Sequence, residues 1–447
     1  MLRRNAGFLI QRKARIPVRV VSSPPGAAVL VNGTKVGVTP YEIEVVLDQS
    51  TTVRIERAGW QPFERNIAQL LPEDMDIQVR LKREPLHRRE LGNAFAPPLL
   101  VDKTLYVLHG TALTALDALA QQQQWSVTSL FDDAALSITG PNATEFVNDK
   151  TWWFPRHNVR PLNGKRLILG LRTGDLLEVS LNSAPAFRKL ATLPREIIGA
   201  PAIEQASLLA GRPLVAIGCA DGKVRVFDPD RPGTPLWEKP IENGAAGAQP
   251  QLNTGAVRRK GNALLALSTQ GRLASFKFVD GQEEWSLQLK GTLAETNALP
   301  EDPNEALAAV VHADGRVAVV DLEARERAWD LPVNQALDEA HSAIAHAQGV
   351  FVLSREGTLK KYARERQPRK MPVWQKPLDG APALPVQAGA NAVYVVTAFN
   401  TIYAISTSSG AVLWDYRAKD KPLQLSACGD YVYVTTSGGE LLVFNAE

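Results

Sequence analysis

The stretch Val311-His312-Ala313-Asp314-Gly315-Arg316-Val317-Ala318-Val319-Val320-Asp321 decides the architecture of this chain, because it is the clearest copy of a repeated unit. An apolar strand runs into an Asp-Gly turn, and a second, alternating strand returns from that turn. Trp329 follows eight residues later, and two further copies lead in the same way to Trp237 and Trp285. Such a repeat specifies how the protein is built, and it says much less about chemistry.

The turns of the repeat recur from about residue 93 to the end of the chain. They fall at Gly110, Gly174, Gly222, Gly271, Gly315, Gly357, Asn400 and Gly439. From Gly174 onward, successive turns are 48, 49, 44, 42, 43 and 39 residues apart. A period of this length made of short strands predicts a β-propeller with four strands per blade. Eight turns predict eight blades, but the interval of 64 residues after Gly110 leaves seven blades as the alternative.

The Trp of each unit is expected to lie in the outer strand and to fill the wedge between neighbouring blades. Trp125 stands at that place in the first unit, and we expect Phe187 to stand there in the second. The last unit, 423–444, ends without such a strand. Because an open sheet edge is a liability, we predict that residues 83–92 supply the strand that closes the last blade.

Residues 16–82 form a separate all-β unit with four short motifs in a fixed order. The motifs are Ser23-Pro24-Pro25-Gly26-Ala27, Val29-Leu30-Val31-Asn32-Gly33, Gly37-Val38-Thr39-Pro40 and Gly59-Trp60. Asn-Gly between alternating strands is the strongest short hairpin signal. These motifs resemble the PEGA domain, and the resemblance implies a small β-sandwich of bacterial envelope proteins without catalytic activity.

The repeat region, 83–447, also resembles a known family. Gly410 stands four residues before Trp414, and this spacing is similar to the quinoprotein, or PQQ-like, propeller repeat. Proteins built in this way include quinoprotein alcohol dehydrogenases and a non-catalytic lipoprotein of the outer-membrane assembly machinery. The whole chain is therefore expected to be all-β, with a PEGA-like sandwich followed by a PQQ-like propeller.

Charge and hydropathy narrow the functional classes. The formal net charge of +3 is too small to indicate a nucleic-acid partner. Residues 1–15 form a basic tail, which we interpret as solvated; the alternative is a juxtamembrane segment that brings the chain near a membrane. No apolar window is long enough for a transmembrane helix, and residues 7–10 fall short of an export signal. The two modules favour an extracytoplasmic place in the cell envelope, with the cytoplasm as the alternative.

The candidates for chemistry have simpler explanations. Asp175, Asp221 and Asp314 lie beside turn glycines, where Asp is favoured by the turn geometry. His341 and His346 lack the spacing of a helical zinc pair, and Cys219 and Cys428 suit small buried side chains, with a disulfide left open. The chain has no adjacent Cys-Cys pair of the kind that alcohol-oxidising quinoproteins carry. We expect no catalytic residue, no metal and no cofactor.

One stretch, 131–160, interrupts the repeat, so the fold does not require it. Its candidate partner-binding residues are Trp152, Trp153, Phe154, Arg156, His157 and Arg160. Aromatic residues and Arg are enriched in binding hot spots. The alternative is that residues 152–154 form a core strand of the second blade. A basic run at 360–370 is interpreted as a solvated edge, with an anionic partner as the alternative.

Together these features favour a non-enzymatic binding or scaffold protein of the bacterial envelope. Its propeller loops would bind a protein or an envelope polymer such as the cell wall. One alternative is the sensor portion of a membrane receptor, for example of a Ser/Thr kinase. Another is a quinone-dependent dehydrogenase, an idea that rests on fold analogy alone. Oligomeric state is not indicated by any feature of the sequence.

Overall fold

The structure is a computed structural model, and every regular element that it describes is a β-strand. It describes residues 15–46, 49–67, 75–92, 97–101, 103–109, 112–127, 159–163, 166–170, 174–180, 186–204, 212–242, 252–294, 299–300, 305–331, 339–365 and 371–446. The chain divides into two compact units, Met1–Leu86 and His87–Glu447. Within the described ranges, no helix has the length and apolar character needed to cross a membrane.

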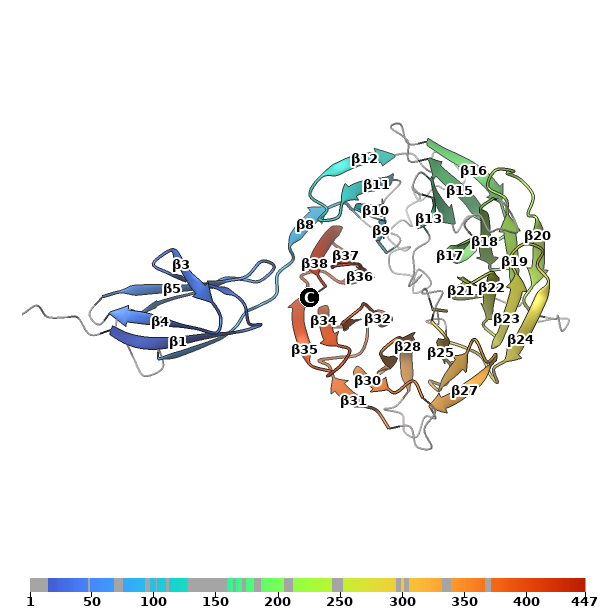
Figure 1. The fold of residues 1–447 in the computed structure, drawn as a ribbon. Helices are drawn as coiled ribbons and strands as arrows, with labels where there is room; N and C mark the ends of the chain where they lie inside the picture. The colour runs from blue at the N-terminus through green and yellow to red at the C-terminus, as the bar shows by residue number, and fades with distance from the viewer. Residues whose placement is uncertain are drawn as a thin grey trace, which may run out of the picture. The chain divides into compact units, whose positions relative to one another are not determined.

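The first unit contains two sheets, ordered β4-β1-β7 and β3-β2-β5-β6 (Figure 1). Its strands are β1 (Arg15–Ser23), β2 (Ala28–Val31), β3 (Thr34–Val38), β4 (Tyr41–Val46), β5 (Thr51–Glu56), β6 (Phe63–Ile67) and β7 (Asp76–Arg80). Alternate residues of the strands are buried, as Val18 and Val20 of β1 and Val53 and Ile55 of β5 illustrate. The sequence did not predict β6, because only the two ends of Phe63–Ile67 are apolar.

The order of motifs in this unit has a physical basis at Thr39. Its Oγ1 lies 2.5 Å from Ser22 Oγ and accepts a 3.0 Å hydrogen bond from the Ala27 N–H, so the first and third motifs meet there. Asn32 and Gly33 have φ values of 48° and 80°. Both residues therefore adopt the left-handed conformation of a tight hairpin turn, and this turn joins β2 to β3 as predicted.

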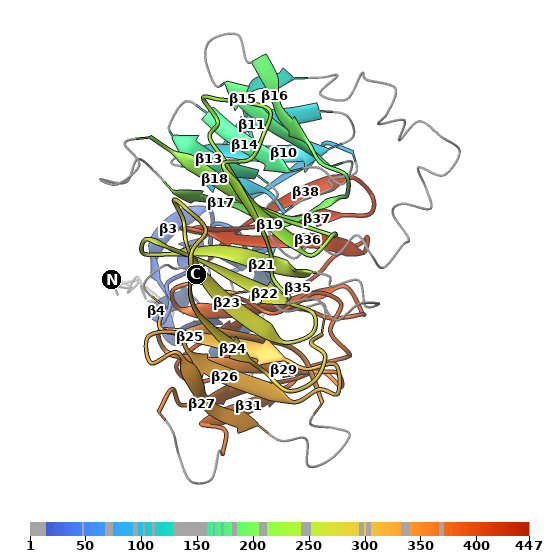
Figure 2. The same cartoon turned by 90° about the vertical axis from the view of Figure 1, so that its right-hand side faces the viewer.

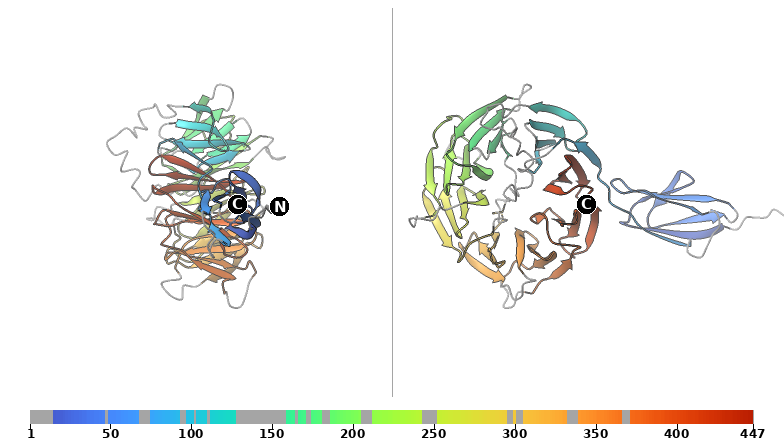
Figure 3. Two further views of the ribbon diagram at one scale, coloured as in Figure 1. Left: turned by 90° about the vertical axis from the view of Figure 1, so that its left-hand side faces the viewer. Right: turned by 180° about the vertical axis from the view of Figure 1, so that it is seen from behind.

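The described residues of the second unit form eight antiparallel sheets around a common axis (Figures 1 and 3). We number the sheets 1 to 8 in chain order. Sheet 1 contains β9 (Leu99–Val101), β10 (Thr104–His109), β11 (Ala112–Asp117) and β12 (Gln123–Val127), and sheet 2 contains β13 (Val159–Asn163), β14 (Arg166–Gly170), β15 (Asp175–Ser180) and β16 (Ala186–Thr192). Sheet 3 contains β17 (Ile197–Glu204), β18 (Leu214–Cys219), β19 (Lys223–Phe227) and β20 (Trp237–Pro240), and sheet 4 contains β21 (Leu252–Lys260), β22 (Ala263–Ser268), β23 (Arg272–Lys277) and β24 (Glu283–Gln288).

Among the described residues, sheet 5 has three strands and each of the other sheets has four. Sheet 5 contains β25 (Leu307–Val311), β26 (Val317–Asp321) and β27 (Glu326–Leu331), and sheet 6 contains β28 (Ala340–His346), β29 (Gly349–Ser354), β30 (Thr358–Tyr362) and β31 (Trp374–Pro377). Sheet 7 contains β32 (Gln387–Ala388), β33 (Ala392–Val396), β34 (Thr401–Ser406) and β35 (Val412–Arg417). Sheet 8 contains β36 (Pro422–Cys428), β37 (Tyr431–Thr436), β38 (Glu440–Asn445) and β8 (His87–Glu90). The innermost strands of sheets 2, 3, 4, 6, 7 and 8 are β13, β17, β21, β28, β32 and β36 (Figure 1). In sheet 1, β9 lies innermost and β12 outermost (Figure 1).

Both ends of the second unit contribute to sheet 8. β8 pairs antiparallel with β38, and Glu90 lies opposite Glu440. Two side chains then join sheet 8 to sheet 1. Arg89 Nη1 donates a 3.3 Å hydrogen bond to the carbonyl of Ala120, and Tyr433 Oη donates a 2.8 Å hydrogen bond to the carbonyl of Ala118.

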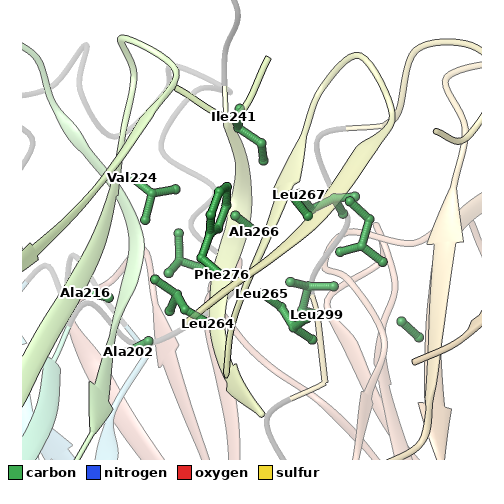
Figure 4. Packing of buried hydrophobic residues seen from close by; sticks show 14 of the residues in the cluster. Ala202, Ala216, Val224, Ile241, Leu264, Leu265, Ala266, Leu267, Phe276 and Leu299 are labelled. Carbon is green, nitrogen blue, oxygen red and sulfur yellow. The ribbon is translucent and has the colours of Figure 1, made fainter. Parts of the chain in front are cut away.

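Apolar residues between neighbouring sheets form the core of the second unit. Because most sheets pack against a neighbour on each face, their middle strands are apolar on both faces, as in β26 (Val317–Asp321). One cluster joins sheets 3, 4 and 5 through Ala216, Phe276 and Val320, among others. Figure 4 shows Ala216 and Phe276 in this cluster. Figure 2 turns the sheets of this region toward the viewer.

Trp residues of several outer strands fasten one sheet to the next, as predicted. In three of them the indole Nε1 donates a hydrogen bond to a carbonyl of the following sheet. The pairs are Trp237 with Phe278 (3.0 Å), Trp329 with Arg364 (3.2 Å) and Trp374 with Thr407 (3.3 Å). The Trp thus supplies both the apolar wedge and a polar contact that holds it in register.

Two of these rings lie on glycines of the following sheet. Gly281 and Gly410 have φ values of 70° and 72°. A Cβ at Gly281 would lie 2.6 Å from the ring of Trp237, and one at Gly410 would lie 2.7 Å from the ring of Trp374. In these two sheets, the glycine four residues before the Trp therefore supports the Trp ring of the preceding sheet.

We expect Gly410→Ala to lower the free energy of unfolding by about 2 kcal/mol, from the left-handed backbone and the contact with Trp374. In a Trp374→Ala background the contact is gone, so the same substitution should cost only about 1 kcal/mol. Urea unfolding of the four proteins measures this coupling. Additive losses would mean that the ring does not restrict Gly410.

The second sheet departs from the predicted pattern. Glu178 is the fourth residue after the turn at Gly174, and the residue opposite it is Arg188, while Phe187 lies opposite Val179. Arg188 Nη2 donates a 2.8 Å hydrogen bond to the carbonyl of Pro229 in sheet 3. By strand pairing, Arg188 occupies the position that Trp occupies in other sheets. The prediction of Phe187 at that position was wrong.

Candidate functional site

Two kinds of connection lie at one end of the second unit. Because consecutive strands are antiparallel, the turn between the second and third strands lies at the same end as the connection that leaves the outer strand. Hydrogen bonds join the two: Leu289 N–H donates to Gly271 (2.8 Å), and Leu378 N–H donates to Gly357 (3.0 Å). We call this end the turn face.

All but one of the predicted partner-binding residues belong to the connection between sheets 1 and 2. Trp152, Trp153, Phe154, Arg156 and His157 lie outside the described residues. Arg160 lies in β13, where its backbone is opposite Ile168. Since the connection leads from the outer strand β12 to β13, it starts at the turn face. Their role in binding a partner stays a prediction.

Phe399 is an exposed aromatic residue on the turn face, and the sequence analysis missed it. Its side chain is 54% exposed. A Cβ at Gly380 would lie 2.8 Å from the Phe399 ring, so the ring covers the connection between sheets 6 and 7. The signal in the sequence was weak, because Phe399 merely stands where sibling turns have Asp314 or Glu356.

The carboxylates of the turns are occupied in structural contacts. Asp314 Oδ1 accepts a 3.1 Å hydrogen bond from the Arg316 N–H, and its Oδ2 lies 2.7 Å from Arg316 Nε. Asp221 accepts from the Lys223 N–H and forms a bidentate pair with Arg225. These contacts agree with the interpretation of Asp221 and Asp314 as turn residues.

The electrostatics of Asp221 follow from the same pair. Burial would raise the pKa of this carboxyl, but the hydrogen bonds and charge of Arg225 outweigh it, so the pKa lies below its ordinary value. Such a carboxylate stays ionised at neutral pH and is a poor general acid or base.

Burial lowers the pKa of two histidines of this region. Burial, with a smaller contribution from Arg355, lowers the pKa of His341 to about 4. Burial and the nearby Arg316 also lower the pKa of His312. Within the described part of the chain, no group of three or more His, Cys, Asp or Glu side chains could hold a metal ion. Cys219 and Cys428 are both free thiols.

The basic run at 360–370 is partly used inside the fold. Lys361 Nζ donates a 2.9 Å hydrogen bond to the carbonyl of Thr407. Arg364 forms two bonds to the carboxylate of Glu305, at 2.9 and 2.7 Å, and a third to the carbonyl of His346. The interpretation of the run as a solvated edge is therefore wrong for Lys361 and Arg364, which join neighbouring sheets.

Comparison with known proteins identifies both modules. The family model described as outer membrane protein assembly factor BamB matches residues 195–307 and 313–447, together more than half of the chain. The PEGA domain model matches residues 15–85. No curated protein matches the chain in sequence.

Solved structures resemble the fold at low sequence identity. BamB from Moraxella catarrhalis is 11% identical, with a TM-score of 0.56 over 81% of this chain and 99% of that one. Sqt1 from Saccharomyces cerevisiae is 12% identical, with a TM-score of 0.55 over 80% and 97%. The computationally designed protein Ika8 is 16% identical, with a TM-score of 0.54 over 80% and 98%. These likenesses concern the fold alone.

Proposed function

The chain belongs to the family of outer membrane protein assembly factor BamB, and on that premise we propose that it is a binding or scaffold protein of the bacterial cell envelope. Its eight sheets act as the eight blades of a propeller, closed by β8, and the turn face binds a protein or an envelope polymer. The PEGA module, a companion of envelope proteins, supports the same compartment. The role is non-enzymatic and needs no cofactor.

The observation that carries the proposal is the exposed aromatic ring of Phe399 on the turn face. The connection that carries Trp152 and Trp153 starts on the same face. Aromatic anchors supply much of the energy of protein interfaces, because they bury a large area at a small cost in conformational entropy. A rigid ring of sheets would hold such anchors in place before the partner arrives.

We expect the double substitution Trp152→Ala, Trp153→Ala to abolish capture of the partner from envelope extract, and Phe399→Ala to weaken it about tenfold or more. The measurement is a pull-down with the immobilised full chain, with partners quantified by mass spectrometry. Each variant is also melted, to separate lost binding from lost folding.

Met371→Ala is the matched control. Its side chain is 71% exposed, and it precedes the outer strand β31, at the end opposite to the turn face. Capture by this variant should equal that of the wild type. Undiminished capture by both turn-face variants would contradict the proposal. A collapsed melting transition in the Trp152/Trp153 variant would show instead that these residues are core.

A further inference from the structure

β8 differs from the other outer strands of the second unit, because it contains no apolar residue. Each of the other described outer strands carries a Trp, Leu or Phe. The residues of β8 are His87, Arg88, Arg89 and Glu90, and none of them is buried. The burial of apolar side chains therefore contributes little to the attachment of β8.

Polar contacts of its two arginines attach β8 to the sheets on either side of sheet 8. Arg89 Nη1 donates hydrogen bonds to the carbonyls of Ala120 (3.3 Å) and Gln121 (3.1 Å) in sheet 1. The guanidinium of Arg88 lies over the ring of Tyr416 in sheet 7, 5.8 Å from its centroid. Such contacts add little net stability at the surface, because water competes for the same groups.

The two ends of β8 are fixed unequally. After the C-terminal end, the N–H groups of Leu91 and Gly92 donate to the carbonyl of Gly439, at 2.9 and 3.1 Å, and the Leu91 side chain packs against the apolar cluster between sheets 1 and 8. At the N-terminal end, His87 lies opposite Val443 and brings no apolar side chain. The strand can therefore peel from His87 while Leu91 keeps the chain attached.

Sheet 8 has contacts with sheet 1 that do not involve β8. Tyr433 Oη donates a 2.8 Å hydrogen bond to the carbonyl of Ala118. Leu441 and Val443 of β38 share a buried cluster with Leu105 of sheet 1. The two sheets can therefore stay packed together when β8 is absent from the edge of β38.

The first unit ends where β8 begins. Within the first unit, the Glu84 N–H donates a 2.9 Å hydrogen bond to the carbonyl of Gly59. Only Pro85 and Leu86 separate Glu84 from His87, and these three steps along the chain span at most about 11 Å. While β8 is paired, the first unit is therefore held on a short leash.

We propose that β8 is a releasable strap, which leaves and rejoins the edge of β38 while the other sheets stay folded. Local openings of this kind occur in the segments with the fewest buried apolar contacts. Release lengthens the free chain from residues 85–86 to residues 85–90, so the span from Glu84 to Leu91 grows to at most about 25 Å. The strap thus switches the reach of the first unit, and it leaves the edge of β38 unpaired.

Hydrogen exchange of the full chain, resolved to peptides by mass spectrometry, tests this proposal. Release of β8 unpairs some of the amides of β38, whereas the amides of β37 require a larger opening of the sheet. We expect those amides of β38 to exchange at least about tenfold faster than the amides of β37. The amides of Leu91 and Gly92 should stay protected.

Arg89→Gln should speed this exchange of β38 roughly tenfold further, because charge-assisted hydrogen bonds to two carbonyls are lost. Arg327→Gln is the matched control. Arg327 also lies in an outer strand, β27, but its ion pair is with Asp330 of the same strand, at 3.3 Å. The exchange of β38 in this variant should equal that of the wild type.

A reversible staple makes the test independent of any effect of Arg89→Gln on folding. Glu90 and Glu440 lie opposite each other and neither is buried, so the double variant Glu90→Cys, Glu440→Cys places two thiols within reach of a disulfide. Oxidation should slow the fast amides of β38 to the rate of β37, and reduction should restore them. Equal rates in β37 and β38 of the wild type, or rates that neither the staple nor Arg89→Gln changes, would overturn the proposal.

Discussion

Trp414→Ala is expected to lower the free energy of unfolding by about 3–5 kcal/mol, the range for deleting a buried aromatic side chain. Trp414 is 2% exposed. Its ring stacks on Phe444 with centroids 5.3 Å apart and contacts Tyr394 at 6.1 Å. It joins sheet 7 to sheet 8, the sheet that both ends of the unit complete. Urea unfolding followed by circular dichroism measures the loss.

Trp125→Ala is the internal comparison for this prediction. Trp125 also lies in an outer strand, but it is only half-buried, and its aromatic contact is Tyr106 of its own sheet, at 5.9 Å. We expect a loss of about half that of Trp414→Ala, in proportion to the smaller buried area. Equal losses would show that burial between sheets does not govern the effect. Trp414→Phe should retain the stacking and recover most of the stability.

Much of the fold could be predicted from the sequence, because each sheet repeats a strand, a turn and a Trp at similar spacing. Local patterns of this kind determine local structure. Contacts made where the Trp of the repeat is absent could not be predicted. Arg188 holds sheet 2 to sheet 3 by donating to the carbonyl of Pro229, and Arg89 holds sheet 8 to sheet 1 through Ala120. Neither Arg differs in the sequence from an ordinary surface residue.

The site was less predictable than the fold for a related reason. A turn tolerates many side chains at its tip, so Phe399 follows no pattern that distinguishes it. Its ring lies against Gly380 of the preceding connection, and this nearness depends on how two sheets pack. The interpretation of the basic run at 360–370 as a solvated edge failed for a similar reason, because Glu305, the partner of Arg364, lies 59 positions away in the chain.

The ion pair of Glu305 and Arg364 is the basis of the second large prediction. Glu305 is 8% exposed, and its carboxylate accepts two hydrogen bonds from Arg364 and one, at 2.9 Å, from the Leu307 N–H. We expect Glu305→Ala to lower the free energy of unfolding by about 3–5 kcal/mol, because Arg364 would be left partly buried without its counter-charge. Equilibrium urea unfolding at pH 7 measures this loss.

The pH dependence of Glu305→Gln tests the electrostatic origin of this loss. Burial would raise the pKa of Glu305, but the hydrogen bonds from Arg364 and Leu307 outweigh it, so the folded pKa lies below the ordinary value of 4.5. The unfolded chain therefore binds this proton first as the pH falls, and the stabilisation is present above pH 4.5 and is lost below it. The difference in unfolding free energy between wild type and Glu305→Gln should be constant from pH 7 to about 5.5 and should shrink at lower pH. A difference that stays constant through pH 4 would mean that Glu305 stabilises the fold by its shape and not by its charge.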